Sequence, residues 1–84
     1  MTQAEIDVLA EREKQRAKWG DGHDNKHDRD DLARAAGHII NGGWVFESWP
    51  ADLRRKHPKR RDQLVIAAAL LLAEIERLDR AGGE

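Results

Sequence analysis

The 84-residue sequence contains no cysteine, no tyrosine and only one phenylalanine. Without cysteine the chain can form no disulfide bond and offers no thiolate to a metal, which fits a reducing cytoplasm. The amino-terminal segment is charged within a few residues and lacks the apolar core of a signal peptide, which argues against export. The longest apolar run, residues 64–73, is too short to cross a bilayer. The sequence therefore predicts a cytoplasmic protein without a membrane partner.

Charge is abundant, and the two signs are segregated. Charged residues make up 37% of the chain, yet the net charge is only −1. Five aspartates lie in residues 21–31, and six lysines or arginines lie in residues 54–61. Such a dipolar surface suits an anionic ligand, a polar partner or self-association. The net charge near zero argues against a general nucleic-acid binder.

Strand signals are also scarce, because no run of β-branched residues alternates with polar ones. Helix signals are strong, and the length is that of one domain. The sequence predicts an all-α fold, a small three-helix bundle with an extra short helical turn. The expected order is a helix over residues 3–18, an acidic loop over 19–29, a helix over 30–41, an aromatic and basic connector over 43–58, and a helix over 59–80.

The first helix has clear signals at both ends. Thr2 and Glu5 have the spacing of a capping box, in which each side chain accepts a backbone N–H of the first turn. Gly20 is expected to end the helix. The apolar face predicted at helical spacing contains Ile6, Leu9, Ala10 and Ala17, with Glu13 in its middle.

The second helix and the short helical turn are expected from the residues that favour the start or the end of a helix. Aspartates in residues 28–31 suit the positive end of the second helix, and Gly42 and Gly43 stop it. Pro50 suits the first position of the short helical turn. The apolar stripe of the second helix consists of Leu32, Ala35, Ala36, Ile39 and Ile40.

The last helix is the longest and the most apolar. Between residues 64 and 72 it is apolar on every side, more than two neighbouring helices of a small chain can cover. We therefore expect a homo-oligomer, a dimer in the simplest case, that associates through this helix. The main stripe is predicted to contain Leu64, Ala68, Leu71, Ile75 and Leu78.

Two histidines in the acidic segment raise the question of a metal site. His23 and His27 are four residues apart, which places two imidazoles on one face if the segment is helical. With Asp24 they would give a divalent metal three ligands. Gly20 and Gly22 favour a loop instead, whose acidic residues would cap the next helix.

Carboxylates on the apolar helices are a second candidate site. Glu74 and Glu76 lie on the last helix, and Glu76 and Asp79 have the spacing of a terminal ExxD. All-α nucleotide pyrophosphohydrolases hold magnesium with inward-facing acids of this kind. The alternative is that Glu74 and Glu76 pair with Arg77 and Arg80 at the surface.

The basic run in residues 54–61 is a third candidate. A guanidinium group can donate two parallel hydrogen bonds to phosphate oxygens, and a lysine can supply a positive charge. Residues that could bind phosphate groups in this way are Arg54, Arg55, Lys59 and Arg60. Trp49 lies just upstream and could stack on a base, although a tryptophan more often closes the end of a core. The alternative for the basic run is a solubilising surface that pairs with the acidic segment.

Several motifs occur together in one order: ERxxQ from Glu11, WG from Trp19, a His-Asp-x-x-His box from His23, Trp49-Pro50 and a final AAALLLAEIERL helix. In this the chain resembles a family of short phage and prophage proteins. The resemblance implies a phage setting and a place in the host cytoplasm, and it implies no particular reaction. Its motif positions are Glu11, Arg12, Gln15, Trp19, His23, Asp24, His27, Trp49, Pro50, Glu74 and Glu76.

Arginine, glutamine, histidine and tryptophan side chains together suit a nucleotide, through its phosphate, base edge and ring. The sequence thus predicts a protein that binds a phosphate-bearing ligand, such as a nucleotide or a cyclic nucleotide signal, and sequesters it against host defence without a cofactor. The alternatives are a metal-dependent nucleotide phosphohydrolase and an inhibitor that binds a host protein. The predicted ligand-binding residues are Glu11, Arg12, Gln15, Trp19, His23, Asp24, His27, Trp49, Arg54, Arg55, Lys59 and Arg60. A metal, if one binds, is expected at His23, Asp24 and His27.

Overall fold

The computed structural model describes residues 1–25, 31–43 and 47–82, with the side chains of residues 19–25 excepted. All regular structure in this part of the chain is helical, which confirms the all-α prediction. None of its helices is long and apolar enough to span a membrane. The helices are α1 (Gln3–Asn25), α2 (Asp31–Asn41), α3 (Trp49–Lys56) and α4 (Arg60–Arg80).

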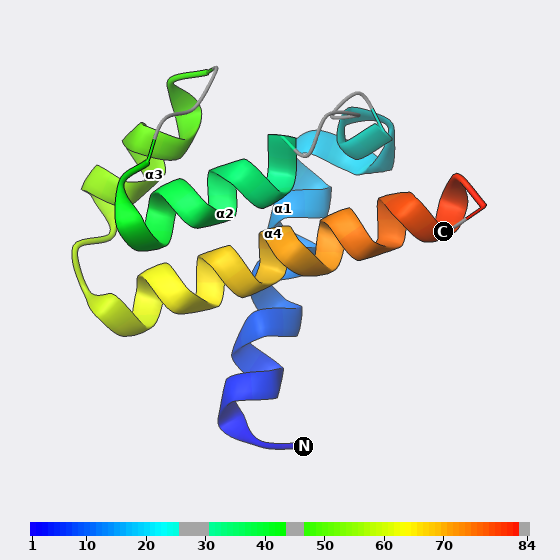
Figure 1. Cartoon of the computed structure of the whole chain (residues 1–84). Coiled ribbons are helices and arrows are strands. Elements are labelled where there is room, and N and C mark those ends of the chain that lie inside the picture. Colours follow the sequence, from blue (N-terminus) through cyan, green and yellow to red (C-terminus); the bar gives the residue numbers. More distant parts are fainter. Residues whose placement is uncertain (26–30, 44–46, 83–84) are drawn as a thin grey trace.

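Helix α4 is the element against which the others are arranged. It contacts both α1 and α2, and α3 contacts α2. In Figure 1, α2 lies beside α4 and runs in the opposite direction, while α1 crosses behind α4 and its first turns project beyond it. The radius of gyration is 12.3 Å, close to the value of about 12 Å expected for a folded chain of this length.

The apolar core lies between α2 and α4. Alanines from both helices are buried in it, and their small side chains allow the two backbones to approach closely. The end of the core is covered by Trp49 and Leu53 of α3, so the prediction that a tryptophan closes the core is confirmed for Trp49. The buried members are Leu32, Ala35, Ala36 and Ile39 of α2 and Ile66, Ala67, Leu70 and Ala73 of α4.

The helix ends mostly follow the local signals. The Thr2 hydroxyl accepts a bond from the Glu5 backbone N–H at 3.1 Å, and the Glu5 carboxylate accepts one from the Thr2 backbone N–H at 2.9 Å. This confirms the capping box, and the bond from Thr2 holds the pKa of Glu5 below its ordinary value of 4.5. Gly42 follows α2 with a φ of 75°, a backbone conformation that favours glycine.

The predicted end of the first helix is wrong. Helix α1 continues past Lys18 and through Gly20 to Asn25, so the first part of the expected acidic loop is helical. A glycine inside a helix costs only about 1 kcal/mol relative to alanine and does not forbid helical geometry, whereas a proline would. The segment contains no proline, and helix therefore continues across its two glycines.

The apolar face predicted for α1 and the main stripe predicted for α4 both point outward. Ile6 and Leu9 of α1 are 46% and 44% exposed, and Glu13 beside them is exposed and pairs with Arg16. In α4 the face with Ala67, Ala69 and Ala73 is buried, and Leu71 of the predicted main stripe is 43% exposed. Close approach of α2 requires small side chains, so the alanine-rich face of α4 packs inward.

Candidate ligand-binding site

The inward face of α1 is polar. Of the described residues of this helix, only Arg12 and Gln15 are buried, at 2% and 5% exposure. Arg12 donates from Nε to the Glu76 carboxylate of α4 at 2.8 Å, and its second terminal nitrogen lies at the same distance from that oxygen. Arg16, one turn further, lies 3.4 Å from it. Helix α1 is thus held on α4 by a charged contact that is buried at Arg12 and partly exposed at Glu76 and Arg16.

Gln15 is fixed beside this contact. Its amide Nε2 donates to the Glu11 carboxylate one turn earlier at 3.3 Å. Its Oε1 is buried and has no hydrogen-bond partner among the described residues. A buried amide oxygen without a donor carries a desolvation penalty of roughly 1–3 kcal/mol. A donor supplied from outside the chain would remove that penalty.

Gln15 lines a pocket of about 210 Å³ between α1 and the end of α3. On α1 the lining residues recur at helical spacing, so they share one face. From the other side come Leu53, Lys56 and His57. The α1 contribution is Glu11, Lys14, Gln15 and Lys18. Three lysines face one carboxylate in this pocket, so its charge favours an anion.

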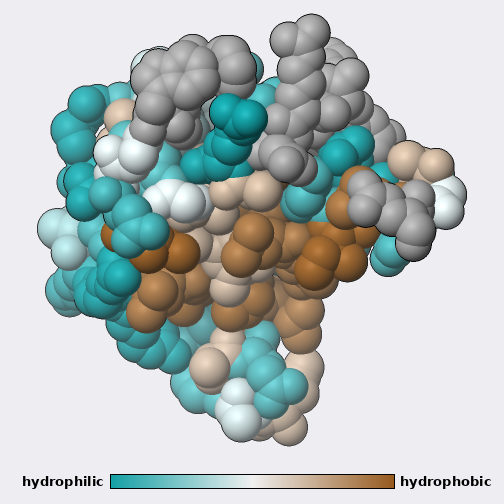
Figure 2. Space-filling view, in the orientation of Figure 1, coloured by the Kyte–Doolittle hydropathy of each residue, from teal (hydrophilic) through white to brown (hydrophobic). Residues whose placement is uncertain are grey.

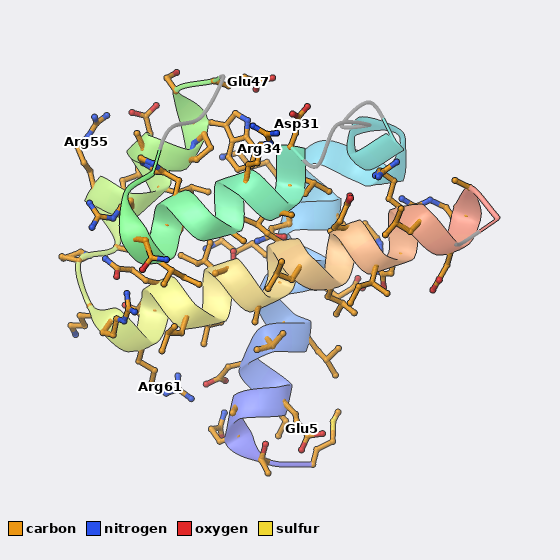
Figure 3. The ribbon with its side chains drawn as sticks, in the orientation of Figure 1. Glu5, Asp31, Arg34, Glu47, Arg55 and Arg61 are labelled. Atoms are coloured by element: carbon orange, nitrogen blue, oxygen red, sulfur yellow. The ribbon has the colours of Figure 1, made fainter. Side chains whose placement is uncertain are left out.

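A second pocket of about 300 Å³ adjoins the first through the shared residues Glu11 and His57. Asp7 and Arg61 line it and form an ion pair at 2.8 Å that joins α1 to the start of α4. Figure 3 shows Arg61 extending from α4 on the side of the amino-terminal half of α1. The bond from Gln3, followed by that from Arg61, holds the pKa of Asp7 below its ordinary value of 3.8.

Three arginines of the basic run lie apart from this site. Arg54 lies against Gly42, Arg55 pairs with Asp52, and Arg60 donates to the backbone carbonyl of Ile40 at 2.8 Å. Arg54 and Arg55 line a separate pocket of about 440 Å³ together with His38. Figure 3 shows Arg55 pointing outward from α3. Of the predicted phosphate ligands, these residues therefore lie apart from Arg12 and Gln15.

The other predicted site residues divide into two groups. Trp49 packs against the core and Lys59 is the exposed residue before α4. The side chains of Trp19, His23 and Asp24, and the whole of His27, lie outside the described residues. Where side chains are described, no three histidine or acidic residues are grouped to hold a metal. The predicted metal site cannot be placed on that basis and stays a prediction.

The carboxylates of α4 already have cationic partners. Glu74, 5% exposed, receives two bonds from Arg77, at 2.7 and 2.9 Å. The predicted pairing of Glu74 with Arg77 is confirmed, although the pair is buried and not at the surface. Glu76 pairs with Arg12 and Arg16 of α1.

Sequence reasoning did not select Lys14, Lys18, Lys56 and His57 as site residues. A signal existed for the first two, because residues 11, 14, 15 and 18 recur at helical spacing and follow the ERxxQ motif. Lys56 and His57 belong to the basic run, but nothing local to the sequence indicates that the end of α3 faces α1.

Comparison of the chain with family models, with curated proteins and with solved structures finds no match. The resemblance to short phage proteins consequently remains a prediction from the motifs, and the function has to be argued from the residues themselves.

Proposed function

We propose that the chain binds a small phosphate-bearing ligand, such as a nucleotide or a cyclic nucleotide signal, in the pocket between α1 and α3. The observation that carries the proposal is the buried Gln15, whose Oε1 has no described donor and which lies in a pocket with three lysines. A ligand that combines an anionic group with an N–H or O–H donor satisfies both features at once.

The chemistry of the pocket assigns roles to its residues. Lys14, Lys18 and Lys56 neutralise phosphate oxygens, which bind cations and N–H donors strongly. Gln15 accepts a hydrogen bond from an exocyclic amine or a sugar hydroxyl. The volume of about 210 Å³ is below the roughly 300 Å³ at which drug-sized sites begin. The pocket accommodates a phosphate group and part of the rest of a nucleotide. The remainder of the nucleotide extends into the adjoining pocket, which shares Glu11 and His57 with the first.

The biological role that we propose is sequestration of a phosphate-bearing signal in the host cytoplasm, consistent with the phage-like motifs. Binding without cleavage is the simplest activity of a pocket built from lysine, histidine and glutamine. Inhibition of a host protein would use the basic and acidic patches of the surface. A metal-dependent hydrolase would use Glu11, His23, Asp24, His27 and Glu74. Product analysis after incubation with Mn²⁺ separates the hydrolase from the binder.

We also propose that the protein works as a homo-oligomer. The supporting observation is the apolar face of α4 that the described residues leave exposed, with Leu64, Leu71 and Ile75 each more than 40% accessible.

The ligand proposal is tested by thermal denaturation in the presence of inorganic phosphate, pyrophosphate, mononucleotides and cyclic nucleotides. A ligand present at 100 times its dissociation constant adds about 2.7 kcal/mol to the free energy of unfolding. Added salt should reduce the effect, because it screens the lysines.

Lys56→Gln and Lys59→Gln form a matched pair for the same test. Both residues are exposed lysines on neighbouring turns, but only Lys56 lines the pocket. Loss of one charge-assisted bond should weaken ligand binding about tenfold in Lys56→Gln and leave Lys59→Gln unchanged. Equal effects of the two substitutions, or no stabilisation by any of these ligands, would rule out this site.

A further inference from the structure

Helix α4 has two apolar faces, and the described part of the chain covers only one of them. Ile66 and Leu70 on the covered face are at most 3% exposed, whereas Leu64, Leu71 and Ile75 on the other face are 45%, 43% and 55% exposed. In Figure 2 hydrophobic residues gather in a band along α4 across the front of the molecule. A contiguous apolar surface of this kind on a small protein marks an interaction site.

The spacing on the exposed face is that of a helix-pairing seam. Its residues are separated by four, three, four and three positions, which is the heptad repeat of a helix that packs against another helix along its length. Helix α1 also packs on α4, but its ion pairs reach Glu76 and Arg61, which are not residues of this seam. The seam consists of Leu64, Ala68, Leu71, Ile75 and Leu78.

The charges at the ends of the seam select one direction for a second helix. Arg61 and Asp79 are 18 residues apart, about five helical turns, so they lie on the same side of α4. Asp79 is exposed, and the Arg61 side chain is 59% exposed although it also pairs with Asp7 of α1. A parallel copy of α4 would set arginine against arginine and aspartate against aspartate. An antiparallel copy sets Arg61 against Asp79 at both ends, with opposed helix dipoles.

We propose, resting on the homo-oligomer proposed above, that a second copy of this chain docks on the exposed face of α4, with the two α4 helices antiparallel. The register that pairs Arg61 with Asp79 also places Leu64 beside Ile75 of the second copy and Leu71 beside Ala68. At the centre of the interface the large side chain of Leu71 then faces the small one of Ala68. On either side of the centre, the large side chains of Leu64 and Ile75 meet. This arrangement has two-fold symmetry and closes on itself as a dimer.

The second copy is favoured over an unrelated protein because the surface is self-complementary. Its apolar seam, its basic end and its acidic end match those of an inverted copy of the same helix. A different protein would need both charges reproduced in reverse order along an apolar helix.

Because the chain has no native cysteine, single cysteines can report the arrangement. A disulfide requires two Cα atoms within about 7 Å. In the antiparallel register, Leu64→Cys of one chain lies beside Ile75→Cys of the other. Two copies of Leu64→Cys are separated by 11 residues along the axis, about 16 Å. The full-length variants are oxidised separately and as a mixture, and the products are identified by intact mass.

The expected result is a disulfide between the two different chains in the mixture and none in either variant alone. Leu9→Cys, with a similarly exposed parent residue on α1, serves as the control for random collisions and should not cross-link. Sedimentation of the unmodified chain should give a dimer. A monomer at several hundred micromolar, cross-linking of Leu64→Cys to itself, or cross-linking of Leu9→Cys as readily as the mixture would overturn the proposal.

Discussion

Arg12 is the residue whose environment departs most from ordinary expectation. Arginine is almost never fully buried unless it is paired, and here a 2% exposed guanidinium meets the Glu76 carboxylate, which is 31% exposed. The ERxxQ motif placed Arg12 in a ligand site, whereas the structure gives it a partner within the chain. Arg12 therefore contributes to the site by holding α1 in place, and Gln15 one turn later lines the pocket.

Replacing Arg12 by methionine is predicted to lower the free energy of unfolding by about 2–3 kcal/mol. Removal of one member of a buried ion pair costs roughly 3–5 kcal/mol, and the loss is smaller here because Glu76 can recover some water. Arg16→Met is the matched control, because Arg16 is 35% exposed and lies 3.4 Å from the same oxygen. Its loss should stay below about 1 kcal/mol. Urea denaturation measures both, and equal losses would contradict the assignment.

At the residue scale, the predictions that succeeded depend on neighbours in sequence. Thr2 and Glu5 bond to each other within one turn, so their spacing alone was sufficient. The ion pair of Arg12 and Glu76 joins residues 64 positions apart. Its formation depends on where α1 crosses α4, and no local pattern encodes that crossing. The same reason explains why Lys56 and His57 were not assigned to the pocket with Lys14.

At the scale of helices, type and boundaries were largely predictable, and orientation was not. Helices α2, α3 and α4 begin and end close to the expected residues, because Gly42, Pro50 and Pro58 mark their limits. The inward face of α4 could not be read from a segment that is apolar all round. The inward face is determined by the packing of α2 against α4. The alanine-rich face is buried because α2 lies close and only small side chains fit between the two helices.

Alanine substitutions of the adjacent residues Leu70 and Leu71 test which face of α4 packs against the core. Leu70→Ala should lower the free energy of unfolding by about 2–5 kcal/mol, the usual range for a fully buried leucine, since Leu70 is 0% exposed. Leu71→Ala, from a side chain that is 43% exposed, should cost less than about 1 kcal/mol. The measurement requires a concentration low enough to keep the chain monomeric. A larger loss for Leu71→Ala would show that the predicted main stripe packs inward after all.

At the scale of the whole molecule, the proposed surfaces are separate. The lysine pocket lies between α1 and α3, and no residue of the α4 seam lines it. The segregated charges indicated that anions and self-association were the partners to consider, but they could not indicate where each would bind. In an 84-residue chain with a thin stability margin, covering the seam would itself add stability.

The thermal midpoint of the protein is therefore predicted to rise with protein concentration. Association that occurs only in the folded state stabilises it by mass action. Above the dissociation constant of a dimer, a hundredfold increase in protein concentration raises the free monomer about tenfold and so adds about 1.4 kcal/mol per chain. Leu71→Glu places a charge in the seam and should abolish the concentration dependence while the helical circular dichroism remains. The same variant should keep its stabilisation by phosphate ligands, because position 71 lies outside the pocket. Loss of both responses would mean that the pocket forms only in the dimer, and a midpoint independent of concentration in the unmodified chain would contradict self-association through α4.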